Sequence, residues 1–379
     1  MSAQIINASD INAYASALGD AVQALRAGRL VVFPTETVYG VAASAARPDA
    51  VARLRTAKGR ADYQPFTVHI GQRRHARRFL TDPSPVARRL MRKGWPGPLT
   101  LVCEEPAPER TEIATLCDSA QLAGMYHEGL VGLRCPDHAA AARFLNEAEV
   151  PVVASSANRQ GQPAPLDLQQ ALRDLHGLVD YAIDAGPTRH SAASTIVEVR
   201  GNGWRILRAG AVDERVVQRM ARSEILFVCT GNSCRSPMAE YLFRRALAER
   251  LECREDELAA AGYVVSSAGT MSLRGGVASP GAMEELARRG VDGGGHRSQP
   301  VTVELIHRAE RIYVMSPEHR AAILELVPAA AGRVWLLDET GPVADPMGGS
   351  ADQYRRCAEQ IERAVTARVE EFLDEDRDW

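Results

Sequence analysis

The sequence predicts an α/β protein with two domains. Its 379 residues exceed the length of one ordinary domain and are comfortable for two. Short apolar runs alternate along the chain with segments whose apolar residues follow the helical period. In the second half this alternation is regular, which predicts a doubly wound parallel sheet with its ligand loops at the carboxyl ends of the strands.

Composition indicates a globular protein, because 45% of the residues are hydrophobic, 25% are charged and the net charge is −3. No apolar run reaches the roughly 18–20 residues of a transmembrane helix, and the N-terminus lacks a basic stretch followed by an apolar core. We therefore expect a cytoplasmic protein with no membrane partner. Its seven cysteines show no spacing typical of a metal site, so reduced thiols and no bound metal are expected.

The first half is predicted to alternate helices and strands. Apolar residues at three- and four-residue spacing predict a helix from Asp10 to Ala27, which Gly28 ends. Further helices are expected at 48–57 and 73–78, and strands at 30–33, 65–70, 99–103, 131–135 and 150–154. Residues 104–129 are polar and are expected to be irregular.

Eight short motifs of the first half follow the order and nearly the spacing of a known family. They are Pro34–Gly40, Lys58-x-Arg60, Pro65–His69, Trp95–Thr100, Arg134-x-Pro136-x-His138, Ser156–Asn158, Ser194–Ile196 and Leu207–Gly210. Each motif is weak alone. Together they resemble the YrdC-like threonylcarbamoyl-AMP synthase family, and residues 10–222 are the expected domain.

This resemblance implies an open, twisted α/β domain that forms L-threonylcarbamoyladenylate from ATP, bicarbonate and L-threonine and releases pyrophosphate. It also implies Mg²⁺ bound with ATP, and tRNA-modifying threonylcarbamoyl transferase machinery that uses the product. By their place in the motifs, the residues expected at ATP are Lys58, Arg60, Ser156, Asn158 and Arg208, and those expected at L-threonine are Thr35, His69, Arg134 and Ser194. Such donors suit this chemistry, because adenylation develops negative charge on phosphoryl oxygens.

The second domain is expected at 224–379, after a short join at 221–224. A buried strand at Ile225–Val228 opens it, and further strands are predicted at 263–266, 311–315 and 333–337. Helices are predicted at 238–251, 280–289, 317–326 and 351–373.

A short loop from Cys229 to Arg235 joins the first of these strands to a helix that opens at Ser236-Pro237. The N–H groups of such a loop and helix N-terminus converge into an anion site, and they also favour the thiolate of Cys229. Arg235 can hold two phosphate oxygens with its planar guanidinium. Most free cysteines after a strand are small buried residues, but the strand–loop–helix context favours a thiolate phosphatase.

Three motifs resemble the low-molecular-weight protein-tyrosine-phosphatase family: Cys229-x5-Arg235-Ser236, Ser267-Ala-Gly269 and Asp345-Pro346. The resemblance implies that Cys229 attacks phosphorus while Arg235 holds the phosphoryl oxygens. It further implies that Asn232 braces the loop, Ser236 bonds to the thiolate, and Asp345 protonates the leaving group and then activates water. A phosphorylated protein is the implied substrate, and no cofactor is implied for this domain.

Within that family the pattern is most similar to bacterial protein-arginine phosphatases. Ser233 stands where tyrosine-directed members often carry a branched apolar residue, and no aromatic residue follows Asp345-Pro346. A small hydroxyl at 233 could meet a guanidinium, but the arginine-phosphatase pattern has threonine there, so phosphoarginine and phosphotyrosine both stay open. Cys234 is either a partner for a protective disulfide with Cys229 or an inert small residue.

Two alternatives to a bifunctional enzyme are considered. In the first, one half is active and the other is a binding module, for instance an RNA-binding first domain. In the second, the second half is an arsenate reductase. That chemistry needs further cysteines to pass electrons, and Cys234, Cys253 and Cys357 include no close downstream pair.

Overall fold

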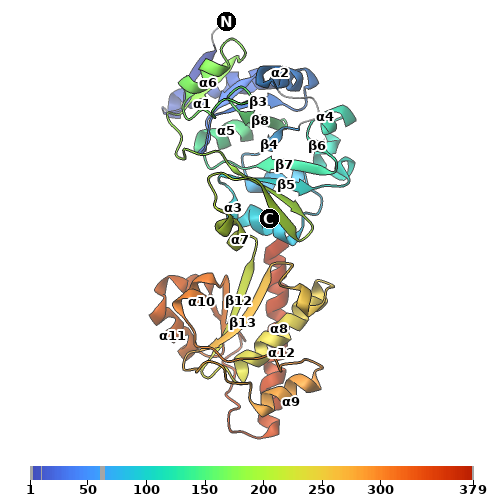
Figure 1. The fold of residues 1–379 in the computed structure, drawn as a ribbon, viewed down its shortest axis with the longest axis vertical. Coiled ribbons are helices and arrows are strands. Elements are labelled where there is room, and N and C mark those ends of the chain that lie inside the picture. Colours follow the sequence, from blue (N-terminus) through green and yellow to red (C-terminus); the bar gives the residue numbers. More distant parts are fainter. Residues whose placement is uncertain (1–2, 10, 60–64, 378–379) are drawn as a thin grey trace. The chain divides into compact units, whose positions relative to one another are not determined.

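The computed structural model describes residues 3–9, 11–59 and 65–377. The chain divides into two compact units, residues 1–221 and residues 222–378 (Figure 1). Each unit is a sheet with helices packed on it, so the predicted α/β fold class with two domains is confirmed.

The first unit is built on a mixed sheet, with strand order β1-β9-β2-β3-β8-β4-β7-β5-β10-β11 and with β6 paired to β7. Its strands are β1 (Gln4–Asn7), β2 (Val31–Phe33), β3 (Gly40–Ser44), β4 (Thr67–His69), β5 (Leu99–Glu104), β6 (Tyr126–His127), β7 (Leu130–Arg134), β8 (Val152–Ser156), β9 (Tyr181–Asp184), β10 (Thr195–Arg200) and β11 (Gly203–Arg208). Parallel pairs such as β5 with β10 and antiparallel pairs such as β5 with β7 occur in this one sheet.

Helices cover both faces of the first sheet. They are α1 (Ile11–Arg26), α2 (Pro48–Lys58), α3 (Pro85–Gly94), α4 (Ser119–Ala123), α5 (Ala139–Glu147), α6 (Leu168–Asp174) and α7 (Glu214–Met220). Successive residues of a strand point to opposite faces. Accordingly, Val31 and Phe33 belong to the core cluster shared with α1 and α5, whereas Val32 belongs to the cluster shared with α2, α3 and α6.

Two predicted segments of the first unit differ from expectation. Residues 73–78 form a 3₁₀ helix. Residues 104–129 are not irregular throughout, since they contain two 3₁₀ turns, α4 and β6. Asp118 begins α4 with a capping box to Gln121, and the side chains of Ile113 and Met125 are buried, which fixes the segment on the core.

The second unit is built on a parallel sheet with strand order β13-β12-β14-β15. Its strands are β12 (Ser223–Cys229), β13 (Tyr263–Gly269), β14 (Arg311–Val314) and β15 (Val334–Leu336), and its helices are α8 (Arg235–Arg250), α9 (Pro280–Arg288), α10 (Val303–Arg308), α11 (Pro317–Leu326) and α12 (Ala351–Arg377). Ile225 and Phe227 pack in the cluster with α8, α9 and α12, and Leu226 and Val228 pack in the cluster with α10 and α11. The predicted doubly wound parallel sheet is confirmed.

The strand order of the second unit prepares a ligand site. The chain leaves β12 for β13 on one side and then returns past β12 to β14, so the order reverses beside β12. Ligands of open α/β sheets bind outside the carboxyl ends of the strands at such a reversal. The strand β12 ends there at Cys229, directly opposite Gly269 of β13.

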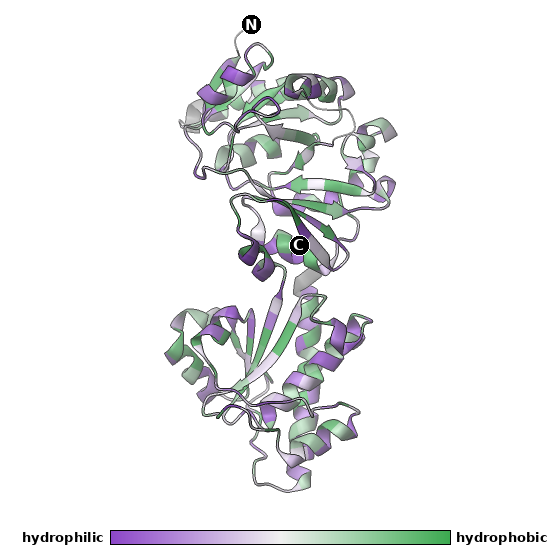
Figure 2. Cartoon of the chain, viewed as in Figure 1, coloured by the Kyte–Doolittle hydropathy of each residue, from purple (hydrophilic) through white to green (hydrophobic). Residues whose placement is uncertain are grey.

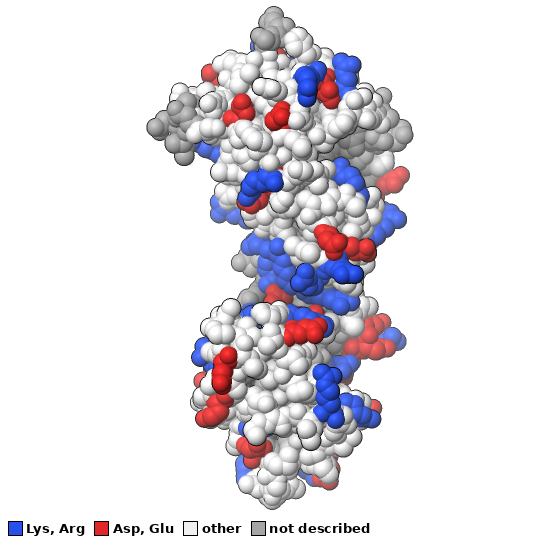
Figure 3. All heavy atoms as spheres, turned by 60° about the vertical axis from the view of Figure 1, so that its left-hand side comes forward, with Lys and Arg blue, Asp and Glu red and all other residues white. Residues whose placement is uncertain are grey.

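The surface pattern agrees with this layering. Figure 2 shows hydrophobic residues along the strands of each unit and hydrophilic residues on outward helix faces. On the face drawn in Figure 3, basic and acidic side chains lie interspersed over both units. Within the described ranges, no helix is both long enough and apolar enough to cross a membrane.

Candidate functional site

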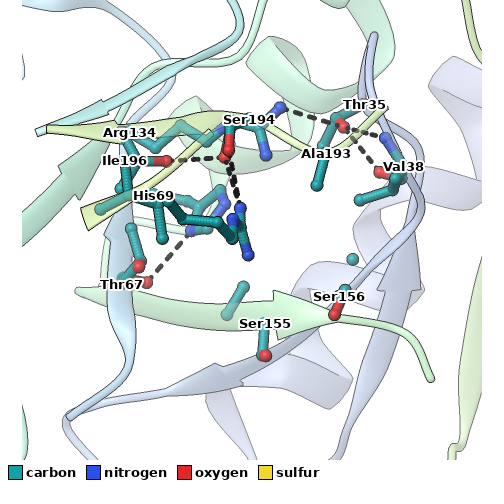
Figure 4. Close-up of a pocket in the computed structure, with 14 residues that line it drawn as sticks. Thr35, Val38, Thr67, His69, Arg134, Ser155, Ser156, Ala193, Ser194 and Ile196 are labelled. Carbon is teal, nitrogen blue, oxygen red and sulfur yellow. Dashed lines mark hydrogen bonds between the residues drawn. The ribbon is translucent and has the colours of Figure 1, made fainter. Parts of the chain in front are cut away.

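A polar pocket of about 130 Å³ lies in the first unit (Figure 4). It brings together residues that are far apart in the sequence. They come from β4, β7, β8, the segment between β2 and β3, and the β10–β11 pair. Six residues predicted at the substrates line it: Thr35, His69, Arg134, Ser156, Ser194 and Arg208.

Arg134 is held at the end of β7 by buried oxygens. Its Nη2 donates to Thr35 Oγ1 and to Glu36 Oε1, each at 3.2 Å, and also to the hydroxyl of Thr37. Glu36 is buried as well, so Arg134 and Glu36 form a desolvated ion pair. Replacing either residue with a neutral one would leave the charge of the other buried without a partner. The Arg134 Nε is buried and has no hydrogen-bond partner among the described residues, which leaves one strong donor for a ligand oxygen.

His69 is a neutral acceptor beside this arginine. Its Nδ1 lies 3.1 Å from the carbonyl oxygen of Thr67, and because a carbonyl only accepts, Nδ1 carries the hydrogen and Nε2 keeps its lone pair. Burial, followed by the positive charge of Arg134, lowers the pKa of His69 to about 3. The ring also packs edge-on against Phe33, with centroids 5.7 Å apart.

Ser194 and Arg208 form another wall of the pocket. Arg208 Nη2 donates to the carbonyl oxygen of Ser194 at 2.8 Å and to its hydroxyl at 3.2 Å. The Ser194 hydroxyl also lies 2.9 Å from that of Thr100. Burial and then the charge of Arg134 lower the pKa of Arg208, which indicates that both guanidinium groups act on the same small volume. The pocket is therefore suited to anionic groups.

Lys58 and Asn158 are not among the residues that line the pocket. The Lys58 ammonium is buried, and its Nζ donates to Ser156 O at 2.6 Å, to Asn158 Oδ1 at 3.3 Å and to Asn158 O. The amide of Asn158 in turn donates to Gln162 O at 2.6 Å. Lys58 thus ties α2 to the loop after β8. Arg60 lies outside the described residues.

Thr67 and Thr100 are among the lining residues that were not predicted, and the sequence held a signal for Thr67. Thr67 precedes His69 by two positions in β4, so both side chains fall on one face of the strand. Thr100 pairs with Arg134 across β5 and β7. That pairing joins distant segments, and only the sheet register reveals it.

The second candidate site is the loop after β12. The sulfur of Cys229 is buried, lies 2.9 Å from Ser236 Oγ and accepts the backbone N–H of Asn232 at 3.3 Å. Donors aimed at sulfur stabilise a thiolate. Asn232 has a φ of 51°, a left-handed conformation that asparagine tolerates, and this turns its N–H back toward the sulfur.

Asn232 braces the loop through three hydrogen bonds of its side chain. Its Nδ2 donates to Ser236 Oγ at 3.0 Å and to Ser267 Oγ at 2.8 Å, and its Oδ1 accepts the N–H of Gln299 at 2.9 Å. Ser267 then donates to Glu240 at 2.6 Å, and burial raises the pKa of that carboxyl. No bracing role was predicted for Gln299 or Glu240, because their contacts with Asn232 and Ser267 join segments that are separated in the sequence.

Arg235 and Asp345 meet beside the same loop. Arg235 begins α8, one residue before the expected helix start, and is buried. Its Nη1 donates to Val343 O at 3.1 Å, and its Nη2 donates to the carboxylate of Asp345 and to Thr230 Oγ1 at 3.4 Å. Asp345 is half-exposed, so its carboxylate stands between the arginine and solvent. The structure thus gathers the predicted nucleophile, arginine and acid.

Cys234 has partners outside the loop. It is buried, with its sulfur 3.1 Å from Ser279 Oγ and 3.4 Å from the hydroxyl of Tyr354. Burial, with the hydrogen bond to Cys234 second, raises the pKa of Tyr354. Ser233 is half-buried, and its hydroxyl lies 3.7 Å from the Cys234 sulfur. Cys229 and Cys234 are both free thiols.

Comparisons with known proteins agree with this division. The family model of Sua5, YciO and YrdC proteins, described as "Telomere recombination", matches residues 23–210, and that of the low molecular weight phosphotyrosine protein phosphatases matches residues 224–378. A putative threonylcarbamoyl-AMP synthase of Mycobacterium leprae is 39% identical over 209 residues, which are 55% of this chain and 90% of that protein. A protein-arginine-phosphatase of Bacillus subtilis is 35% identical over 147 residues, 38% of this chain and 91% of that protein.

The chain belongs to both families.

Its first unit is a threonylcarbamoyl-AMP synthase domain and its second a low-molecular-weight phosphatase domain, so both halves are enzymes. The phosphatase domain is also 37% identical to EpsP of Ralstonia nicotianae, a probable low molecular weight protein-tyrosine-phosphatase, over 38% of this chain and 92% of that protein. The residues described here contain no group of three His, Cys, Asp or Glu side chains that could hold a metal ion.

Proposed function

We propose that the synthase domain forms L-threonylcarbamoyladenylate from L-threonine, bicarbonate and ATP, releases pyrophosphate, and supplies tRNA-modifying threonylcarbamoyl transferase machinery. The observation that carries this proposal is one polar pocket that combines two arginines with a neutral histidine acceptor. Pockets that enclose a whole ligand usually measure about 300–1,000 Å³. The volume of about 130 Å³ suits the amino-acid part, and the nucleotide would extend past Ser156 toward Lys58.

In this scheme Arg134 meets the threonine carboxylate through its unpartnered Nε, within a wall that includes Thr35 and Ser194. His69 accepts a hydrogen bond from the amino acid. Lys58, Arg60, Ser156, Asn158 and Arg208 are assigned to the nucleotide side. The amine of L-threonine first combines with bicarbonate, with loss of water, to give the carbamate. A carbamate oxygen then attacks the α-phosphorus as the bond to pyrophosphate breaks, and the cationic groups stabilise the charge that develops. Mg²⁺ enters as part of the MgATP substrate and is assigned no ligand in this chain.

Pyrophosphate release by the purified protein tests the synthase proposal. Release should require ATP, L-threonine and bicarbonate together, and Arg134→Ala should lower it by about a hundredfold, since removing one charged donor in a desolvated site costs about 3 kcal/mol. Arg205→Ala changes an exposed arginine of the same domain and should have no effect. Release without threonine, or no release at all, would favour a binding module instead.

We further infer that the phosphatase domain hydrolyses phosphorylated proteins through a phosphocysteine. The Cys229 sulfur attacks phosphorus while Asp345 gives its proton to the leaving group, and Arg235 holds the phosphoryl oxygens. Asp345 then takes a proton from water, and the resulting hydroxide cleaves the S–P bond. Ser236 and Asn232 supply the donors on the sulfur that make it a thiolate before attack and a good leaving group afterwards.

Phosphoarginine is the preferred substrate in this proposal, with phosphotyrosine as the alternative. Relatives named for each specificity have similar identity to this domain, so identity does not decide. The observation that supports this choice is the half-buried hydroxyl of Ser233 at the loop, together with an exposed Met347 and no aromatic residue at 346–350. A phenyl ring would find no aromatic partner there, whereas a guanidinium can donate to the hydroxyl.

Peptides carrying phosphoarginine or phosphotyrosine, assayed side by side, test the specificity. Wild type should favour phosphoarginine in kcat/KM. Ser233→Ile should lower phosphoarginine turnover by about tenfold or more and leave phosphotyrosine turnover nearly unchanged, and Ser233→Thr should behave like wild type. A wild-type preference for phosphotyrosine, or an equal loss on both substrates, would contradict the assignment.

A further inference from the structure

Behind Arg235 runs a chain of hydrogen bonds that the catalytic roles above do not use. It passes from Arg235 to Thr230 in the loop, then to His319 in α11, and ends at Ser316, the residue before that helix. His319 is 5% exposed, so its ring is a built-in part of the site and not a surface side chain.

The direction of the bonds in this chain follows from its two ends. An arginine only donates, so Thr230 Oγ1 accepts from Arg235 Nη2 at 3.4 Å. At the other end the Ser316 hydroxyl donates to the Glu318 carboxylate, so Ser316 Oγ accepts from His319 Nδ1 at 2.9 Å. Burial, followed by the charge of Arg235, lowers the pKa of His319 and favours the neutral ring. A neutral ring that carries its hydrogen on Nδ1 accepts at Nε2, so the Thr230 hydroxyl donates to His319 Nε2 at 2.9 Å.

At the far end of this chain of hydrogen bonds, the Ser316 hydroxyl bonds to His319 and does not cap its own helix. Ser316 is the N-cap residue of α11, where a serine normally accepts a backbone N–H of the first turn. In the described structure it makes no such side-chain bond. Its hydroxyl instead bonds to Glu318, which holds the pKa of that carboxyl below its usual value. The chain thus runs in one direction from the guanidinium to a carboxylate.

We propose that His319 is a positioning residue of the phosphatase, which fixes Arg235 toward the phosphoryl group by ordering the Thr230 hydroxyl. This inference rests on the phosphatase function proposed above. Arg235 Nη2 also holds Asp345, and that carboxylate must turn to the leaving group during the reaction. When it turns, Thr230 is the side-chain partner that remains on this nitrogen in the described structure, while Val343 O holds Nη1. A Thr230 hydroxyl fixed by His319 keeps the guanidinium in place.

Kinetics on p-nitrophenyl phosphate test the role. His319→Ala and Thr230→Val should each lower kcat/KM by about tenfold, as expected for one hydrogen bond to a charged group, and should weaken vanadate inhibition by a similar factor. The double variant should be no worse than either single variant, because both break one chain. His319→Gln, which keeps an acceptor and a donor, should recover part of the loss. His307→Ala, an exposed histidine of the same domain, is the matched control. Additive losses, or unchanged vanadate inhibition, would overturn the proposal.

Nitrogen NMR of the His319 ring gives a readout that does not depend on turnover. The wild-type ring should show the Nδ1-protonated tautomer, and Thr230→Val should change the signal of Nε2. An Nε2-protonated ring in wild type would overturn the proposal. If wild type hydrolysed neither p-nitrophenyl phosphate nor a phosphoarginine peptide, the phosphatase function would fail, while the tautomer and vanadate binding would still decide the positioning role.

Discussion

At the residue scale, burial fixes protonation states before any substrate arrives. His69 shows this most clearly, since its desolvated ring beside Arg134 has a pKa lowered to about 3. A cationic imidazole would be repelled by the guanidinium groups of the pocket and could not accept a hydrogen bond at Nε2. The pocket therefore presents one neutral acceptor between two permanent donors at any physiological pH.

The pKa of His69 predicts a specific acid sensitivity. The unfolded chain protonates this histidine near pH 6.5 and the folded chain near pH 3, so between these values the unfolded state binds more protons. Its contribution to the free energy of unfolding is complete above pH 6.5 and falls by about 1.4 kcal/mol per unit as pH drops toward 3. Denaturant unfolding from pH 7 to pH 4 should give a shallower loss for His69→Gln than for wild type. In wild type the His69 ring signal should not titrate in NMR between pH 5 and 8, and a midpoint near 6.5 would refute the buried neutral ring.

At the element scale, a feature can be predicted from the sequence when the residues that form it lie close together in the chain. The loop at Cys229 was predicted because its donors, Asn232, Arg235 and Ser236, lie within seven residues of the nucleophile. The wall of the synthase pocket was not predicted in full, because the contact of Thr100 with Ser194 joins positions 94 residues apart. A single motif can identify such residues only when a resemblance to a known family indicates which strands pair with one another. The strands β1, β3, β6, β9, β10 and β11 were not predicted for the same reason, since their short runs are recognisable as strands only in the assembled sheet.

The close packing of Gly269, at the end of β13, against the Cys229 loop predicts the effect of adding a methyl group there. A Cβ added to Gly269 would lie 2.5 Å from Thr230 O and 2.9 Å from Asn232 N, so the loop must shift. Gly269→Ala should lower phosphatase kcat/KM by at least tenfold and slow alkylation of Cys229 by iodoacetate. Gly332→Ala adds a methyl group with no described atom within 4 Å and should leave both unchanged. A fully active Gly269→Ala would show that the loop can accommodate the added methyl group without losing its active conformation.

At the scale of the whole molecule, each site is complete within its own unit. The lining of the synthase pocket comes from residues 35–208, and the phosphatase loop with its partners comes from the unit that begins at residue 222. Among the described residues, neither site includes a side chain from the other unit.

This separation predicts independent inactivation. Cys229→Ser should abolish phosphatase turnover, because an alcohol at this position is a far weaker nucleophile than a thiolate, and should leave pyrophosphate release at the wild-type rate. Arg134→Ala should do the reverse. Both assays are run on the same full-length preparations. A fall of both activities in either variant would show that the two sites depend on one another.

The contact between Arg235 and Asp345 has a consequence for ligand choice. With no ligand bound, the cation that should hold a phosphoryl group is neutralised by the carboxylate that should serve the leaving group. An incoming inorganic anion replaces one member of this pair and leaves the other without its partner. A molecule that brings an anion for the guanidinium and an N–H donor for the carboxylate replaces both at once. An ester of phosphate has an oxygen acceptor at its bridge, whereas a phosphorylated guanidine has N–H groups there. If the proposed phosphoarginine preference holds, we expect stable phosphoguanidine mimics to inhibit this domain more strongly than phosphonate analogues of tyrosine do.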